Sequence, residues 1–224
     1  MGLDMYLNKM PRYRGATAND VSAVESYLDW IAAKEKGSEH ANCTFEKWCG
    51  REKIPSQKYI DFYSKFYNKK YSSWDTEKKY GWDRIMEQVG YWRKANHIHN
   101  WFVENIQNGE DDCDYHREVT EEDLEELLAL CNKIKEIAIM ESAPVVNGYT
   151  YKDGKDVPIY DDGAQIVNAD EIEALLPTQC GFFFGGTDYD SYYMEDIEET
   201  IDIITKVLET TDFETEMVYY VSSW

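Results

Sequence analysis

The side chains best suited to chemistry gather in residues 90–102, which read GYWRKANHIHNWF. If this segment is helical, at about 100° per residue, Arg93, Asn96, His97 and Asn100 lie on one side of it. A guanidinium group can bind phosphate or carboxylate through two hydrogen bonds, and side-chain amides can read the edge of a base or sugar. The pattern predicts a site for an anionic or nucleotide-like ligand. The alternative is a polar helix side that pairs with acidic residues.

Two histidines of this segment, His97 and His99, are candidates for general acid–base chemistry, with Arg93 holding an anionic substrate. They do not predict a shared metal ion unless the segment is a strand, because residues two apart on a helix point about 200° apart. Cys113 and His116 have a ligand-like spacing, but no second pair completes a tetrahedral site. We therefore expect neither a metal nor another cofactor.

The turn at residues 185–190, GGTDYD, is the second candidate site. Backbone amides at the start of the helix that follows can receive an anion, which makes Asp188 and Tyr189 candidate ligand-binding residues. Asp188 and Asp190 would oppose an anion and would equally cap the helix. These two acids could instead gather with Asp4 as carboxylates for acid–base work or for Mg²⁺.

The elements that position these residues follow from hydrophobic spacing. Capping-box spacings at Thr17/Asp20 and Thr120/Asp123 each precede an apolar helical stripe. The patterns predict helices over 19–36, 83–107, 169–176, around 124–138 and around 197–208, and strands at 3–7, 182–184 and 217–221. Several long helices, few strands and no regular βαβ alternation predict an α+β fold, with amphipathic helices packed on a small, mostly antiparallel sheet.

We expect residues 1–224 to form a single domain, because the chain has no repeat of 20 to 50 residues and no low-complexity linker. Residues 37–80 are aromatic and locally basic, which is the chemistry of a surface for single-stranded nucleic acid. The helical spacing of Tyr59, Phe62 and Phe66 favours a stripe that faces the core instead.

Residues 143–168 have the composition of a hairpin-like insertion. They contain three pairs that are typical of tight turns, separated by short β-prone pieces. The pairs are Asn147-Gly148, Asp153-Gly154 and Asp162-Gly163.

The formal net charge of -21 is unevenly distributed along the chain. Residues 1–103 carry 17 Lys and Arg against 13 Asp and Glu, whereas residues 104–224 carry 6 against 31. The acidic half should repel nucleic acids and acidic membrane surfaces, so direct nucleic-acid binding is not expected. It could attract a basic partner, or it could simply be a solvated exterior.

Targeting signals and cysteine usage predict a cytoplasmic protein. The chain shows no secretory leader and no apolar run near the roughly 18 residues of a membrane span, so we expect no membrane partner. The five cysteines are scattered and odd in number, which favours free thiols in a reducing compartment.

The segments MGLDMYL, GYWRKANHIHNWF, LPTQCGFFFGGTDYD and YYVSSW resemble a family of small proteins encoded by bacteriophages, prophages and other mobile elements. The resemblance covers residues 1–10, 88–131 and 175–224. It implies an accessory protein of the host cytoplasm that binds a host component or a nucleotide-like or anionic ligand, with a counter-defence role. The family has no established activity, so no catalytic residues carry over.

Three functions stay open on these observations. The first is a binding protein whose partner is a host protein or a small anionic ligand. The second is an enzyme on a phosphorylated or nucleotide substrate that uses His97 or His99 with Arg93. The third is an acidic inhibitor that mimics DNA, with carboxylates spaced like phosphates along one face. The absence of a nucleophile elbow, Walker loop, dinucleotide fingerprint or HExxH motif favours the binding protein.

Overall fold

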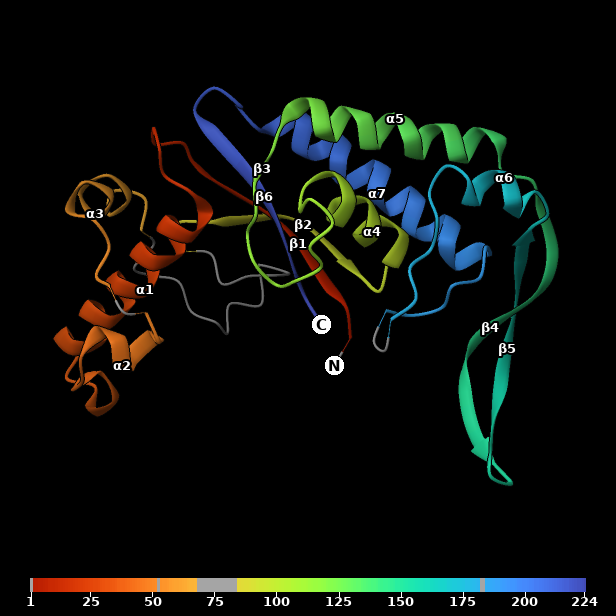
Figure 1. The fold of residues 1–224 in the computed structure, drawn as a ribbon, viewed down its shortest axis with the longest axis horizontal. Coiled ribbons are helices and arrows are strands. Elements are labelled where there is room, and N and C mark those ends of the chain that lie inside the picture. Colours follow the sequence, from red (N-terminus) through yellow and green to blue (C-terminus); the bar gives the residue numbers. More distant parts are fainter. Residues whose placement is uncertain (1, 52, 68–83, 182–183) are drawn as a thin grey trace.

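The computed structural model describes residues 2–51, 53–67, 84–181 and 184–224 (Figure 1). Its elements, in chain order, are β1 (Asp4–Pro11), α1 (Ala18–Glu35), the 3-10 helix η1 (Glu39–Ala41), α2 (Phe45–Cys49), α3 (Gln57–Tyr63), β2 (Glu87–Arg93), α4 (Asn96–Asn105), β3 (Glu118–Val119), α5 (Glu121–Ile137), β4 (Met140–Lys152), β5 (Lys155–Ile166), α6 (Ala169–Glu173), α7 (Ser191–Thr210) and β6 (Glu216–Ser223). Helices pack on a mostly antiparallel sheet, so the predicted α+β class is confirmed.

Strand β1 lies inside a four-stranded antiparallel sheet of order β2-β1-β6-β3. The register between β1 and β2 places Asp4 opposite Arg93. Side chains alternate across a strand, so Met5 and Leu7 point into one hydrophobic core while Met10 belongs to a second. The sheet therefore has an apolar core on each face.

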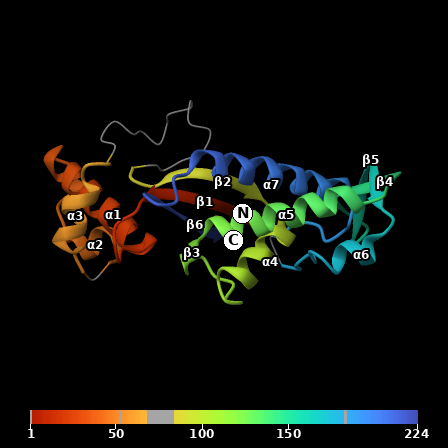
Figure 2. The ribbon, with the colours of Figure 1, turned by 90° about the horizontal axis from the view of Figure 1, so that it is seen from above.

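The larger core lies between the sheet and helices α4, α5 and α7. It buries one apolar stripe from each helix, represented by Ile98, Leu127 and Ile197. Figure 2 shows α5 and α7 running side by side. The Trp92 indole on β2 donates a 2.9 Å hydrogen bond to the Thr200 hydroxyl on α7. These contacts fix the position of α7 relative to β2, and both elements supply residues to the site described below.

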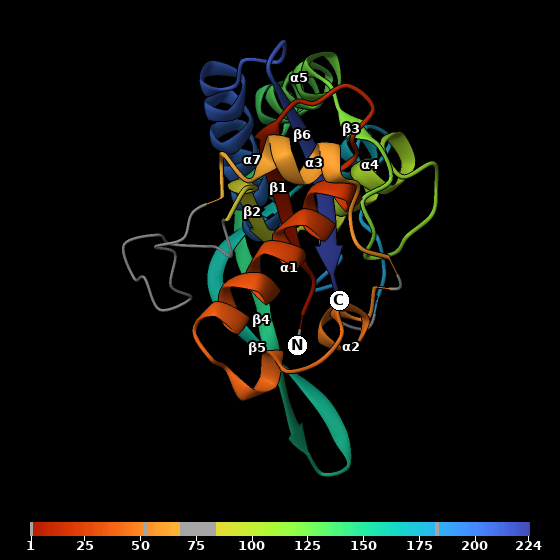
Figure 3. The same ribbon diagram turned by 90° about the vertical axis from the view of Figure 1, so that its left-hand side faces the viewer.

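The smaller core covers only one end of the sheet, where α1 and α3 lie (Figure 3). Tyr59 and Tyr63 of α3 are buried there beside Val21 of α1, which confirms a core-facing position for Tyr59. Phe66 is 46% exposed, so the predicted stripe is wrong at that residue. The reason is that α3 ends at Tyr63, and the helical spacing does not continue past it. Residues 68–80 of the aromatic and basic segment lie outside the described residues.

The predicted helix over 83–107 is wrong in its first half. Residues 87–93 form β2 and pair with β1, and only α4 is helical. Lys94 separates the two in a left-handed conformation, with φ of 63°, and its N–H donates to Leu3 O at 2.8 Å. Pairing with a distant strand overrides the local helical spacing of Val89 and Trp92. Arg93 is therefore at the end of a strand and not on the helix that carries His97.

Strands β4 and β5 form one long hairpin that projects from the body (Figures 1 and 3). Asp153-Gly154 makes its turn, with positive φ at both residues, as the sequence predicts. Asn147-Gly148 instead lies at an irregularity in β4, and Asp162-Gly163 lies within β5, so these two predicted turns are wrong. Strand β5 ends in the larger core at Ile166, and Val145 of β4 is also buried.

The other predicted helices and the two terminal strands are confirmed within a few residues. Capping boxes at Thr17 and Thr120 begin α1 and α5. Of the predicted strand at 182–184, residues 182 and 183 lie outside the described residues, and Phe184 is buried in a bend. None of the described helices combines the length and apolar character needed to span a membrane.

Candidate functional site

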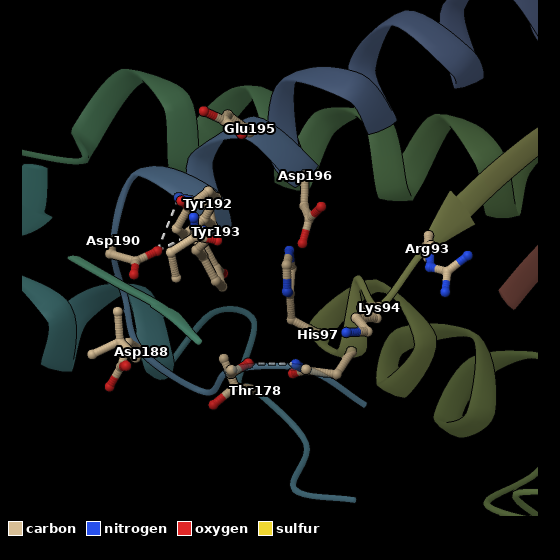
Figure 4. A pocket seen from close by; sticks show the side chains of 15 residues that line it. Arg93, Lys94, His97, Thr178, Asp188, Asp190, Tyr192, Tyr193, Glu195 and Asp196 are labelled. Carbon is tan, nitrogen blue, oxygen red and sulfur yellow. Dashed lines mark hydrogen bonds between the residues drawn. The ribbon is translucent and has the colours of Figure 1, made fainter. Parts of the chain in front are cut away.

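A cavity of about 290 Å³ lies where the first turns of α4 and α7 meet Thr178, residues 185–190 and the middle of strand β4 (Figure 4). The structure thereby brings together the two candidate segments, 90–102 and 185–190, which are far apart in the sequence. Among the candidate ligand-binding residues, Arg93, Asn96, His97 and Asp188 line the cavity.

Asn100 and Tyr189 do not line this cavity. Asn100 is partly buried one turn further along α4. The Tyr189 hydroxyl accepts a hydrogen bond from the Thr178 N–H at 3.1 Å, and its ring packs 5.1 Å from that of Tyr193. Asp4 does not line the cavity either. Its carboxylate accepts a 2.6 Å hydrogen bond from the Tyr91 hydroxyl. The expected gathering of Asp4 with Asp188 and Asp190 is therefore not seen.

One end of the cavity is cationic. Arg93 is 57% exposed at the end of β2, and its guanidinium lies 3.9 Å from the Asp4 carboxylate. Lys94 follows it in the left-handed conformation, which glycine adopts freely and lysine adopts at a cost of about 1 kcal/mol. The two side chains place neighbouring positive charges at the rim of the cavity.

The start of α4 adds an anion-binding element beside these cations. Its N-cap residue is Ala95, which has no side-chain acceptor, and no side chain caps the helix among the described residues. Uncapped N–H groups and the positive end of the helix dipole favour a bound phosphate or carboxylate. Asn96 and His97, in this first turn, both line the cavity.

Asn96 holds the opposite wall of the cavity in place. Its side-chain amide donates to the carbonyls of Phe184 and Gly186, at 3.2 and 2.7 Å, and accepts from the Gln179 N–H at 2.9 Å. Gly185 lets this loop approach closely, because a Cβ there would lie 3.1 Å from the Cβ of Lys94 and its φ is +93°. Both N–H donors of the Asn96 amide and one acceptor site of Oδ1 position the loop, and Asn96 also lines the cavity.

His97 is the most unusual polar residue of the cavity. Its side chain is 1% exposed, its ring stacks on that of Tyr193 at 4.1 Å, and Nε2 has no hydrogen-bond partner among the described residues. Burial lowers the pKa of His97 to about 3, so the imidazole is neutral at physiological pH. Buried polar atoms are normally paired, which makes this nitrogen a candidate contact for a ligand.

The other end of the cavity is acidic, and its acids are Asp188, Asp190, Glu195 and Asp196. Asp190 also caps α7, because its carboxylate accepts from the N–H groups of Tyr192 and Tyr193. Burial, reinforced by Glu199, Glu195 and Asp190, raises the pKa of Asp196 to about 8. Figure 4 shows the Asp196 carboxylate directed toward the imidazole of His97.

Sequence reasoning missed Lys94, Tyr193 and Asp196. A signal for Asp196 exists, because it lies three residues after Tyr193 and four before Thr200, which are buried residues of α7, and Asp196 itself is partly buried. An acid at such a position needs a partner or a ligand. Recognising it requires knowing which side of α7 faces the sheet.

His99 points away from the cavity into a buried network. It is 0% exposed, with Nδ1 2.6 Å from the Tyr220 hydroxyl and Nε2 2.9 Å from Asp111. An ionised carboxylate only accepts, so Nε2–H donates to Asp111 and Nδ1 accepts from the Tyr220 hydroxyl. His99 is therefore a structural residue of α4, and the acid–base role considered for it has no geometric basis in this cavity.

One group of potential metal ligands lies outside the cavity, in the loop before β3. Ligand atoms of Glu110, Asp112 and His116 lie within 4.8 Å of one another. His116 Nε2 is already hydrogen-bonded to Asp112 Oδ1 at 2.7 Å. Cys113, which the sequence paired with His116, is exposed and is not a member of this group.

Replacing His97 with phenylalanine is expected to raise the free energy of unfolding by about 1 kcal/mol. Phenylalanine keeps the ring that stacks on Tyr193 and removes the unpaired buried nitrogen, which costs stability while it has no partner. His97→Ala, by contrast, loses the stacked ring and should destabilise the protein by about 2 kcal/mol. Urea denaturation of the three proteins measures both changes, and equal losses in the two variants would contradict this interpretation.

Comparison with known proteins does not indicate a function for this cavity. No family model, no curated protein and no solved structure matches the chain.

Proposed function

We propose that this protein binds a small ligand through an anionic group held at the cationic end of the cavity. One arrangement carries the proposal: Arg93, Lys94 and the first turn of α4, which has no side-chain cap, line the same cavity as a buried imidazole nitrogen that lacks a partner among the described residues. Guanidinium groups and helix N-termini both bind phosphate and carboxylate. Binding of such a group would also offset the left-handed conformation of Lys94, because strained residues are often retained at ligand sites.

The size of the cavity favours a metabolite over a macromolecule. Its volume of about 290 Å³ is at the lower limit of the range of small-molecule pockets, roughly 300 to 1,000 Å³. A fragment of a nucleotide or a small phosphorylated or carboxylated compound fits this space. The resemblance to proteins of mobile elements supports an accessory role in the host cytoplasm, in which the protein sequesters such a compound to counter a host defence.

Replacing Arg93 with alanine is expected to weaken binding of phosphate-bearing compounds tenfold or more, which corresponds to about 1.4 kcal/mol. The measurement is isothermal titration of the full chain with orthophosphate, pyrophosphate and a panel of nucleoside monophosphates. Arg14→Ala is the matched control, because Arg14 is exposed and does not line the cavity. An equal loss in both variants would indicate a general charge effect and contradict a site at Arg93.

An enzyme on a phosphorylated or nucleotide substrate is the second candidate. The observation that favours it is the pairing of His97 and Asp196 in one cavity, with the pKa of His97 lowered and the pKa of Asp196 raised. Opposite shifts of this kind divide acid and base roles between neighbouring groups. Asp196 would be the general acid at neutral pH. Release of inorganic phosphate during incubation with a bound compound would support an enzyme, and recovery of the intact compound would support a binding protein.

A further inference from the structure

We propose that the ligand is a zwitterion, with its anionic group at Arg93 and Lys94 and a protonated amine between the imidazole of His97 and the carboxylate of Asp196. The inference rests on the proposed function, because it places a second group of the same ligand in the same cavity. It assigns the substrate class as amino acids or short aminoalkyl phosphates.

The first argument is the pair of polar groups that face each other without contact. His97 Nε2 is buried and has no hydrogen-bond partner in the part of the chain that the structure describes, so the carboxylate of Asp196 does not reach it. Figure 4 nevertheless shows that carboxylate directed toward the imidazole, and both side chains line the cavity. When the proton of neutral His97 is on Nδ1, Nε2 is an acceptor, and together with an ionised Asp196 carboxylate it defines a position for a donor group of a ligand.

The second argument concerns which chemical group fits between two acceptors. An ammonium group has three donors and no acceptor, so it can donate to neutral His97 and to ionised Asp196 at once. Phosphate and carbonyl oxygens only accept and would face both groups unfavourably. A hydroxyl group has a single donor and would leave one of the two acceptors unpaired.

The third argument is the charge of this end of the cavity. Asp188, Asp190 and Glu195 line it together with Asp196, whereas Arg93 and Lys94 lie at the opposite end in Figure 4. Burial and the neighbouring acids raise the pKa of Asp196, and a cation beside it would restore its ionised form.

A metal ion fits the same space less well. Tight binding of Zn²⁺ needs about four ligands at close to 2 Å, and Ca²⁺ needs six or more oxygens. Among the described residues, the potential ligand atoms that gather within 4.8 Å of one another belong to Glu110, Asp112 and His116, outside the cavity. His97 and Asp196 supply two ligands without a close third, which suits an amine.

The test uses matched pairs of compounds that differ only in the amine. Isothermal titration of the full-length protein compares O-phosphoethanolamine with ethyl phosphate, and β-alanine with propionate. We expect the amine-bearing member of at least one pair to bind ten or more times tighter. The two pairs distinguish phosphate from carboxylate as the anionic group. Asp196→Asn should remove the preference for the amine while ethyl phosphate still binds.

Two further variants keep the result interpretable. Asp202→Asn makes the same chemical change on the exposed side of α7 and should retain the preference. His97→Phe keeps the stacked ring, removes the Nε2 acceptor and should reduce the preference as Asp196→Asn does. Cooperative unfolding of each variant in the absence of compounds shows that the fold is intact.

Each outcome decides between the two proposals. If ethyl phosphate binds as tightly as O-phosphoethanolamine, in an Arg93-dependent way, the zwitterion is overturned and the proposed function stands. If MgCl₂ or ZnCl₂ alone binds in a manner that Asp196→Asn abolishes, the space holds a metal and the amine is again overturned. If none of the four compounds and no phosphate compound binds, the proposed function and this inference both fail.

Discussion

Replacing His99 with leucine is expected to lower the free energy of unfolding by about 3 kcal/mol, even though His99 does not line the cavity. His99 joins α4 to β6 through the Tyr220 hydroxyl and to the loop before β3 through Asp111. Leucine fills similar space but breaks the two hydrogen bonds of a fully buried side chain, one of them to a partly buried carboxylate. Urea denaturation monitored by tryptophan fluorescence measures the change.

A double-mutant cycle separates the hydrogen bond from the loss of packing. Tyr220→Phe removes the hydroxyl that His99 contacts, so the double variant should be more stable, by about 1 kcal/mol, than the sum of the single changes implies. His40→Leu is the control, because His40 is exposed and should change stability by no more than about 0.5 kcal/mol. Additive losses in the cycle would show that the hydrogen bond between His99 and Tyr220 does not contribute to stability.

The network around His99 also reaches the cavity. Asp111 accepts from the Gln179 side chain at 3.2 Å, and the Gln179 N–H donates to Asn96. Gln179 therefore connects the buried histidine to the loop that forms one wall of the site. The polar residues of segment 90–102 therefore have two different roles. His97 and Arg93 face the cavity, whereas His99 and Asn96 hold its walls.

Elements that depend on local signals were predictable from the sequence. The helices after Thr17 and Thr120 begin at capping boxes whose partners lie three residues away, and no distant contact is needed to define them. The turn at Asp153-Gly154 is equally local, because both residues tolerate positive φ. Asn147-Gly148 has the same composition but lies in a strand, since pairing along the whole hairpin outweighs one turn-prone pair.

Elements that depend on distant pairing were not predictable in the same way. The apolar residues of 85–92 have helical spacing, and only their pairing with β1 makes them a strand. That error misplaced Arg93 relative to His97. The candidate site was nevertheless partly recovered, because a left-handed turn at Lys94 returns both residues to one cavity.

The acidic end of the site depends on the packing of α7, which the sequence does not define. The apolar stripe of α7 indicated its buried side, but the cavity at that side is also lined by residues distant in the sequence, among them Val146, Thr178 and Gly185. Asp196 can therefore be recognised as unusual only once these segments are in place.

The stability of the protein is expected to fall as the pH rises from 6.5 to 8, by about 2 kcal/mol relative to Asp196→Asn. The pKa of Asp196 is raised from 3.8 to about 8 on folding, so the folded state keeps a proton that the unfolded state has lost. The native state then binds more protons than the unfolded state, and stability decreases with pH by up to about 1.4 kcal/mol per pH unit until the folded carboxyl ionises.

The pH window follows from the second buried group, His97, whose effect has the opposite sign. Folding lowers the pKa of His97 from 6.5 to about 3. The stability that neutral His97 contributes is therefore fully present above pH 6.5, and it is lost as the pH falls below that value. Between pH 4 and 6.5, Asp196 makes the free energy of unfolding fall with pH, whereas His97 makes it rise. Above pH 6.5 only Asp196 still changes the free energy of unfolding with pH.

His97 is present in both wild type and Asp196→Asn, so its pH dependence cancels when they are compared. Urea denaturation from pH 5 to 9 should therefore show the stability of wild type falling relative to Asp196→Asn by up to about 1.4 kcal/mol per pH unit up to pH 8, and no further above it. Asp202→Asn, on the exposed side of the same helix, should follow the wild type, and parallel curves for all three proteins would show that Asp196 ionises freely in the folded state.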